Sequence, residues 1–126
     1  KAARGTDGRI YPWGDDPPAK DRCNFGNYVG DTTTIGRYSP QGDSPYGCAD
    51  MAGNVFEWCR ESYAAYESSA RSGDGERLNV PTKNRIVRGG GYLSEAREAR
   101  VSARNFIAED QRVAALGVRP VRQLTR

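Results

Sequence analysis

The fold is decided by YGCADMAGNVFEWC, the stretch Tyr46–Cys59. In its second half Phe56 and Trp58 share one parity, and Val55 and Glu57 share the other. Side chains of a β-strand point alternately to opposite faces of the sheet, so this pattern predicts a strand with one apolar and one polar face. The glycines before it predict an irregular turn that leads into the strand.

The same stretch carries a candidate set of metal ligands. Its oxygen donors are two carboxylates and the two backbone carbonyl groups between them: Asp50, Glu57, Gly53 and Val55. A turn that enters the strand would bring these four oxygens toward one point. Oxygen ligands of this kind suit a hard cation such as calcium.

Length and composition predict one domain with a modest core. The chain has 126 residues, which suits a single domain and is short for two. Apolar residues make up 37% of it and the mean hydropathy is −0.79, while 15 glycines and 7 prolines indicate many turns. The core therefore depends on the aromatic residues: two Trp, seven Tyr and three Phe.

Charge is distributed unevenly along the chain. Residues 1–84 carry 10 basic and 12 acidic side chains, a net charge of −2, whereas residues 85–126 carry nine arginines and four acids, a net charge of +5. The two halves either pair inside one fold or present the arginines to an anionic ligand or nucleic acid. No lysine-rich run and no aromatic residues interleave with the arginines, which favours pairing and argues against nucleic acid as a partner.

Cysteine and histidine usage excludes several kinds of site. Cys23, Cys48 and Cys59 form neither a secreted disulfide framework nor a CxxC zinc pair. A bridge between Cys48 and Cys59 requires Cα atoms within about 7 Å, which the sequence does not determine. The chain has no histidine, so a Ser-His-Asp triad and imidazole-ligated metals are excluded within it.

The sequence contains no apolar run of membrane-spanning length and no basic-then-apolar signal segment. We therefore expect a soluble protein without membrane insertion. The compartment is unknown.

Local patterns predict few regular elements. Strand character is expected at Gly30–Ile35, at Arg85–Arg88 and around Val118, and weak helical propensity at Arg60–Arg71 and Glu95–Phe106. The polar residues 68–84 predict a surface loop. Three glycines follow Arg88 and indicate positive φ angles or a close backbone approach.

Asn24 and Asp31 are further oxygen donors in the first half of the chain. They could form a second, weaker cation site. Alternatively they are turn formers, because Asn and Asp beside glycine commonly adopt turn conformations.

Several motifs in order resemble the formylglycine-generating enzyme / sulfatase-modifying-factor family. They are Tyr11-Pro-Trp-Gly, the run Asp50–Trp58, Arg88-Gly-Gly-Gly-Tyr92, Ala103-Arg104 and Leu116-Gly-Val-Arg119. The resemblance implies an α+β, C-type-lectin-like fold with short twisted antiparallel strands, little helix and much ordered loop. It therefore favours irregular chain with at most short elements over a helix at Glu95–Phe106.

The resemblance covers nearly the whole chain but only the later part of the family's domain. Lys1–Gly5 looks like the last turn of a helix ending at a glycine. We expect residues 1–126 to form a single domain that lacks the family's N-terminal portion.

The chemistry of the family does not carry over to this sequence. Cysteine-oxidising members bind copper with two cysteines after the glycine run, and the matching positions here are Ser94 and Ala99. Copper(I) prefers soft thiolate ligands, so we do not expect copper or catalysis at these positions. A second branch, the iron-dependent sulfoxide synthases, uses histidines from a separate domain.

The resemblance also assigns calcium to the opening motif, through the Asp50 and Glu57 side chains and the Gly53 and Val55 carbonyl groups. The alternative is that Glu57 pairs with an arginine from the C-terminal segment. At family-typical positions, Arg104 and Arg119 are interpreted as buried arginines paired with acids. Trp13 and Trp58 are interpreted as core residues rather than carbohydrate-stacking platforms.

Three classes of function remain open. The favoured one is a non-catalytic lectin-fold module that binds a protein, peptide or small molecule through the loops Arg37–Tyr46 and Gly91–Gln111. The second is an oxidase acting with a missing N-terminal half or partner, in which Tyr92, Ser94 and Arg97 line a pocket. The third is a regulatory domain attached to a kinase or a surface protein.

Overall fold

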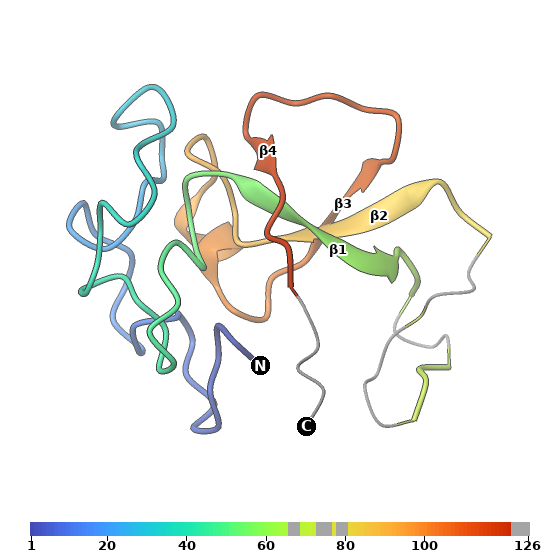
Figure 1. Cartoon of the computed structure of the whole chain (residues 1–126), viewed down its shortest axis with the longest axis horizontal. Coiled ribbons are helices and arrows are strands. Elements are labelled where there is room, and N and C mark those ends of the chain that lie inside the picture. The colour runs from blue at the N-terminus through green and yellow to red at the C-terminus, as the bar shows by residue number, and fades with distance from the viewer. Residues whose placement is uncertain (66–68, 73–76, 78–80, 122–126) are drawn as a thin grey trace.

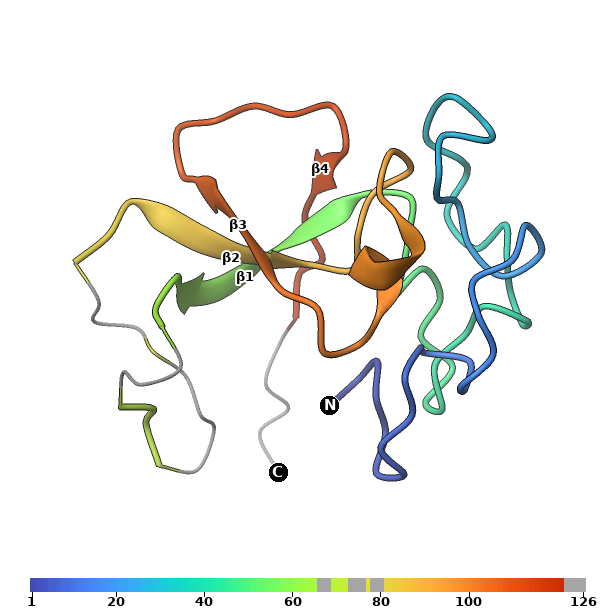
Figure 2. The ribbon, with the colours of Figure 1, turned by 180° about the vertical axis from the view of Figure 1, so that it is seen from behind.

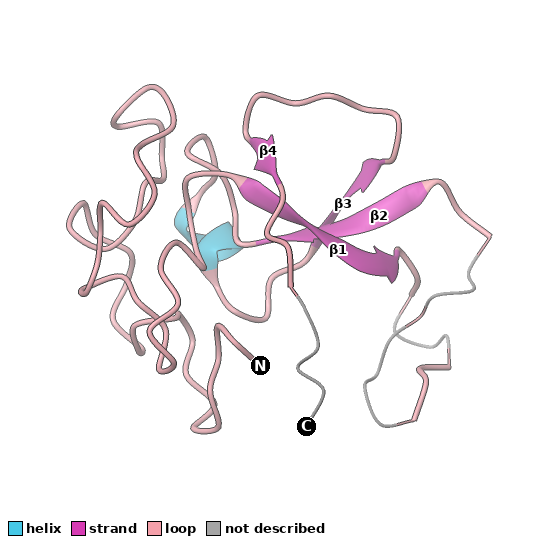
Figure 3. Ribbon diagram, in the orientation of Figure 1, coloured by secondary structure: helices cyan, strands magenta, loops and turns pink. Residues whose placement is uncertain are grey.

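A computed structural model, which describes residues 1–65, 69–72, 77 and 81–121, contains one four-stranded sheet. Its strands are β1 (Phe56–Ser62), β2 (Asn84–Arg88), β3 (Asn105–Ala108) and β4 (Leu116–Gly117), in the spatial order β3-β2-β1-β4 (Figure 1). The β1–β2 and β2–β3 pairs are antiparallel, and the β1–β4 pair is parallel. The one helix in the described ranges is the 3₁₀ turn η1 (Ala96–Ala99), shown in Figure 3.

The centre of the sheet is buried on both faces. Trp58 on β1 pairs with Val87 on β2, and Ile86 on β2 pairs with Phe106 on β3. Ile86 and Val87 are 0% exposed although their side chains point to opposite faces, because adjacent strand residues alternate. These buried β-branched residues explain why β2 forms where the sequence predicts a strand.

The first half of the chain is an ordered coil packed beside the sheet. Figures 1 and 2 show residues 1–55 winding along one side of it in successive turns. Tyr11 and Trp13 stack with their ring centroids 5.4 Å apart, and Trp13 packs against the buried cluster of Tyr11, Ala52 and Ala99. The interpretation of Trp13 as a core residue is confirmed.

Two of the predicted elements are wrong. Gly30–Ile35 is not a strand: the backbone N–H of Thr33 donates to the side chain of Asn54, and Ile35 is 85% exposed. The helical prediction for Arg60–Arg71 fails at its start, because β1 continues to Ser62. Residues 66–68 lie outside the described residues, as do 73–76 and 78–80 of the predicted loop 68–84.

Glu95–Phe106 behaves as the family resemblance implies. Helix formation stops after Ala99, and Asn105 already belongs to β3. Cross-strand pairing of Phe106 with Ile86 thus overrides the helical propensity of the Ala, Glu and Arg residues. Within the described part of the chain, no helix is long and apolar enough to cross a membrane.

Candidate functional site

The carboxylate of Glu57 is held by Arg119. Nε of Arg119 lies 3.0 Å from Oε1 and 2.9 Å from Oε2, and Nη2 lies 2.7 Å from Oε1. Nη2 also donates to the carbonyl oxygens of Ala49 and Asp50, at 3.0 and 3.1 Å. The hydrogen bonds to Glu57 raise the pKa of Arg119. The predicted pairing of Arg119 with an acid is confirmed, although its side chain is partly exposed.

Asp50 and Gly53, two other members of the predicted calcium set, also have roles in the backbone scaffold. Asp50 adopts φ 53° and its Oδ2 accepts a hydrogen bond from the Gly36 N–H at 2.6 Å. The N–H of Gly53 donates to the Gly89 carbonyl at 2.8 Å. Because a guanidinium already neutralises Glu57, this first set is a poor fit for a divalent cation.

Asn24 is the better candidate for an oxygen ligand. Its side chain is 0% exposed, and Nδ2 donates to the Asp31 carbonyl at 2.8 Å, which fixes the orientation of the amide. Oδ1 is left buried without a hydrogen-bond partner in the described structure. Buried acceptors of this kind are rare and call for a water molecule or an ion. Asp31 itself is exposed, and its Oδ1 accepts the N–H of Thr32 at 2.6 Å.

Ser94 and Ala99, which the family resemblance matched to copper-binding thiols, are interior parts of the scaffold. Ser94 is 6% exposed and its Oγ accepts the Gly91 N–H at 2.9 Å. Ala99 is 3% exposed and belongs to the core cluster. Neither side chain is available to a ligand in this conformation.

The other two predicted pocket residues face different surroundings. Tyr92 is half-buried, and its backbone N–H donates to the Asn54 carbonyl at 2.8 Å. The side chain of Arg97 is 76% exposed and pairs with Glu95 at 3.2 Å. The structure therefore places Tyr92, Ser94 and Arg97 in three environments rather than around one cavity.

All three cysteines are free thiols, so the bridge between Cys48 and Cys59 is not formed. Burial, with the nearby charge of Asp21, raises the pKa of Cys23 to about 12. Burial also raises the pKa of Cys59, and the nearby Arg88 opposes this shift. Neither group is an activated thiolate, because activation requires a lowered pKa.

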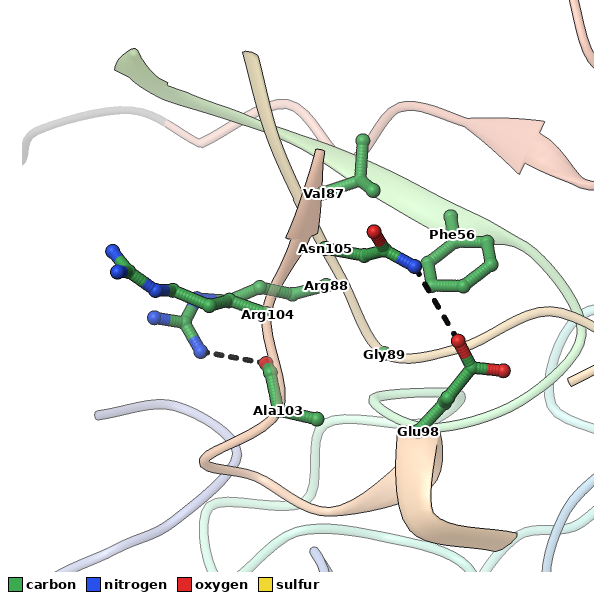
Figure 4. A pocket seen from close by; sticks show the side chains of 8 residues that line it. All are labelled: Phe56, Val87, Arg88, Gly89, Glu98, Ala103, Arg104 and Asn105. Carbon is green, nitrogen blue, oxygen red and sulfur yellow. Dashed lines mark hydrogen bonds between the residues drawn. The ribbon is translucent and has the colours of Figure 1, made fainter. Parts of the chain in front are cut away.

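A small cavity lies where β2, β3 and η1 meet (Figure 4). Its volume of about 20 Å³ is enough for one water molecule. Nη1 of Arg88 donates to the Ala103 carbonyl at 2.8 Å, and Nδ2 of Asn105 lies 3.4 Å from Oε1 of Glu98. Arg104 beside it donates to the Ala64 carbonyl at 3.0 Å. This cavity is too small for an organic ligand.

A larger pocket lies against the opposite end of β2. Its volume is about 360 Å³, and it is lined by β1, β2 and the start of the β3–β4 connection: Trp58, Cys59, Arg60, Arg85, Glu109 and Gln111. The sequence did not predict this pocket. Its residues come from three separate segments, and the pairing of β2 with β3, together with the hydrogen bond from the Glu109 N–H to the Lys83 carbonyl, brings Glu109 near β2.

Comparison with known families identifies the scaffold. The model of the sulfatase-modifying factor enzyme 1-like domain matches residues 1–124. The chain belongs to this family. The motif at Asp50–Trp58 and the glycine run at Gly89–Gly91 are therefore family features, and the α+β, C-type-lectin-like fold class predicted from them is confirmed.

Relatives in this family have varied names. The chain is 37% identical to the serine/threonine-protein kinase pkn1 of Chlamydia pneumoniae over 106 residues, 82% of this chain and 16% of that protein. It is 33% identical to the formylglycine-generating enzyme of Thermomonospora curvata, covering 94% of this chain and 45% of the enzyme. It is 30% identical to the hercynine oxygenase of Mycobacterium tuberculosis, covering 88% of this chain and 26% of the oxygenase. The chain thus spans less than half the length of these relatives.

Solved structures share the fold. Treponema denticola variable protein 1 matches with a TM-score of 0.65 and 27% identity, covering 93% of this chain and 41% of that protein. PvdO from Pseudomonas aeruginosa matches with a TM-score of 0.75 and 24% identity, covering 93% of this chain and 46% of PvdO. The likeness to PvdO shows the fold alone.

Proposed function

We propose that this chain is a non-catalytic binding module on the formylglycine-generating-enzyme scaffold. The observation that carries the proposal is the state of Ser94 and Ala99. Ser94 is buried and accepts a hydrogen bond within a turn, and Ala99 contributes its methyl group to the core. The positions that the family resemblance assigns to copper thiols thus serve packing, and neither offers a soft ligand.

Exposed loops supply the surface for binding. Tyr46 and Leu93 are 61% and 58% exposed, and they lie in or next to the two predicted binding loops, Arg37–Tyr46 and Gly91–Gln111. Large apolar side chains on loops are common contact residues, and loops carry function when a rigid scaffold positions them. The similarity to a protein named a variable protein supports this use of the fold.

The kinase relatives support a role as a module within larger proteins. In the Chlamydia pneumoniae protein the matching region is 16% of the length. A domain that recurs as a small part of chains with different names fits a binding role better than a fixed chemistry. The alternative is an oxidase that acts together with further protein, as the names of the relatives from Thermomonospora curvata and Mycobacterium tuberculosis suggest.

Copper binding separates these two functions. Titration of the chain with copper(I) against a competing chelator should show no tight one-to-one site. The substitution Ser94→Ala should leave the titration unchanged, because Ser94 has no role in metal binding in this proposal. A tight site that Ser94→Ala removes would overturn the proposal.

We further propose that calcium stabilises the scaffold through Asn24 and Asp31. The buried, unpaired Oδ1 of Asn24 supports this assignment, since amide oxygens are ordinary calcium ligands. The set at Asp50, Gly53, Val55 and Glu57 has weaker support because Arg119 occupies the Glu57 carboxylate. Calcium would act here by stabilising the folded loop, without a part in chemistry.

A further inference from the structure

The pocket of about 360 Å³ has the size of a small-molecule site. The strand pairs place its main residues on one face of the sheet: Trp58 lies opposite Val87, and Ser62 lies opposite Arg85. Residues that pair across strands share a face, as do residues two apart in a strand. Glu109 and Gln111 also line this pocket and belong to the chain that follows β3. Figure 1 shows this connection leaving β3 at the top.

Arg85 is held in place at this pocket by two neighbours. Its Nε and Nη2 donate to Oε2 of Glu109 at 3.1 and 3.0 Å, and its Nη1 donates to Oγ of Ser62 at 2.8 Å. Guanidinium has five N–H groups, and three are used in these bonds. Two N–H groups of this fixed guanidinium therefore have no partner among the described residues, and a ligand that used them would add little ordering cost.

Trp58 adds an apolar surface and another donor. Its ring is half-buried, and its indole N–H makes no hydrogen bond with the described part of the chain. The buried, unpaired side-chain atoms of the described residues do not include this indole nitrogen, so the nitrogen is at least partly exposed to solvent. A buried or ligand-facing indole N–H usually finds an acceptor.

The charges at the pocket favour an anion. Among the described lining side chains, Arg60 and Arg85 are positively charged and Glu109 is negatively charged. The side chains of Arg85 and Glu109 are 37% and 49% exposed, so their ion pair is weak enough for a ligand to share the guanidinium.

We propose that this pocket binds a carboxylate that is attached to a flat apolar group. The carboxylate accepts from Arg85 and the Trp58 indole N–H, and the apolar group packs on the indole ring. The ligand is either a free aromatic acid or the C-terminal aromatic residue of a peptide, since both offer the same chemistry. This inference rests on the proposed binding function and names the ligand class for it.

The test uses N-acetyl-phenylalanine and a tetrapeptide ending in phenylalanine, each paired with its C-terminal amide. The chain has two tryptophans, so two indole N–H signals appear in a nitrogen–proton correlation spectrum, and Trp58→Phe assigns them. Either acid should shift the Trp58 signal and leave the Trp13 signal in place. The matching amides should bind about tenfold more weakly, because a charge-assisted bond is lost.

Two variants and one control sharpen the result. Arg85→Gln should weaken binding about tenfold, and Gln111→Glu should weaken it about fivefold by placing a like charge at the exposed rim. Gln111 is exposed, so this second variant gives a result even where Arg85→Gln fails to fold. Arg4→Gln removes one exposed arginine outside this pocket and outside both binding loops, and it should change nothing.

Equal binding of acids and amides would overturn the inference. A loss with Arg4→Gln as large as with Gln111→Glu would do the same, because it would indicate general attraction to a basic surface. The two acid arms separate the sources: binding of the tetrapeptide alone indicates a peptide C-terminus. Failure of this test leaves the copper titration unaffected, so the two proposals fail separately.

Discussion

Glu57 and Arg119 join β1 to the chain that follows β4, 62 positions apart. Replacing Arg119 with alanine leaves the Glu57 carboxylate, which is 22% exposed, without this guanidinium, and removes the donor to two carbonyl groups. Because the pair is partly exposed, water screens it, and we expect a loss of about 1–2 kcal/mol in the free energy of unfolding. Urea unfolding measures this loss.

Arg97→Ala is the matched control for that prediction. It breaks the exposed pair with Glu95, whose two side chains are 76% and 72% exposed, so the change should stay within about 0.5 kcal/mol. Equal effects of the two substitutions would contradict the structural role of Arg119.

The orphaned oxygen of Asn24 predicts an effect of calcium on stability. The temperature of unfolding should rise with calcium concentration and fall with a chelator, as linkage requires for a ligand of the folded state. Asn24→Ala should abolish the shift, whereas Glu57→Gln should retain it. A shift lost only with Glu57→Gln would move the site to the opening motif, and no shift would assign the orphaned oxygen to a water molecule.

The thiols should differ in reactivity in the order Cys48, Cys59, Cys23. Cys23 is 1% exposed with a pKa of about 12, so it stays protonated and shielded at pH 8, while Cys48 is half-exposed. Timed alkylation followed by peptide mass spectrometry measures the order. Early modification of Cys23 would show that the first half of the chain opens readily.

The raised pKa of Cys23 also predicts a dependence of stability on pH. The folded pKa of about 12 lies above the ordinary value of 9.0, so the folded state binds the proton more tightly than the unfolded state. Stability from this group is complete below pH 9 and declines as the pH rises toward 12. Cys23→Ser should flatten that decline in urea unfolding, and an unchanged slope would show that other groups cause it.

Between segments of the coil, one close crossing is that of Gly53 over Asn24. Gly53 has φ 77°, and a Cβ atom there would lie 2.5 Å from the Asn24 carbonyl oxygen. Gly53→Ala should therefore destabilise the fold by about 3 kcal/mol, through backbone strain and overpacking together. Gly26→Ala is the control, because Gly26 has a similar φ of 61° with no atom within 4 Å, and should cost about 1 kcal/mol.

Chemical denaturation of both variants measures the difference. Similar losses for the two would mean that the close approach at Gly53 is relieved cheaply. The turn would then depend on the positive φ angle alone.

Sequence patterns located the elements that depend on local alternation and missed those that depend on distant partners. β1 was predicted because Phe56–Trp58 alternates, and β2 because Arg85–Arg88 contains two β-branched residues. β3 was hidden in a segment of helical propensity, since pairing with β2 makes it a strand. Gly30–Ile35 has strand composition, but the N–H of Thr33 donates to the side chain of Asn54 in place of a neighbouring strand.

For the whole molecule, the family was predictable and the candidate binding surface was not. The order of the motifs along the chain predicted the family. The pairing of Arg119 with Glu57 was one of two alternatives for the Glu57 carboxylate. The pocket at Trp58 and Arg85 depends on how three segments meet in space, which the spacing of residues along the chain does not determine. Ser94 illustrates the same limit. The family resemblance predicted that Ser94 lines a pocket, whereas the turn in which its Oγ accepts the Gly91 N–H buries the side chain.

The proposal that this scaffold is non-catalytic is tested most directly by an assay for cysteine oxidation. The chain is incubated in air with copper(I) and a peptide that bears the sulfatase cysteine motif, and the peptide is examined by mass spectrometry for the aldehyde. The formylglycine-generating enzyme of Thermomonospora curvata serves as the positive control. We expect the peptide to be unchanged by this chain, and copper-dependent aldehyde formation would contradict the account.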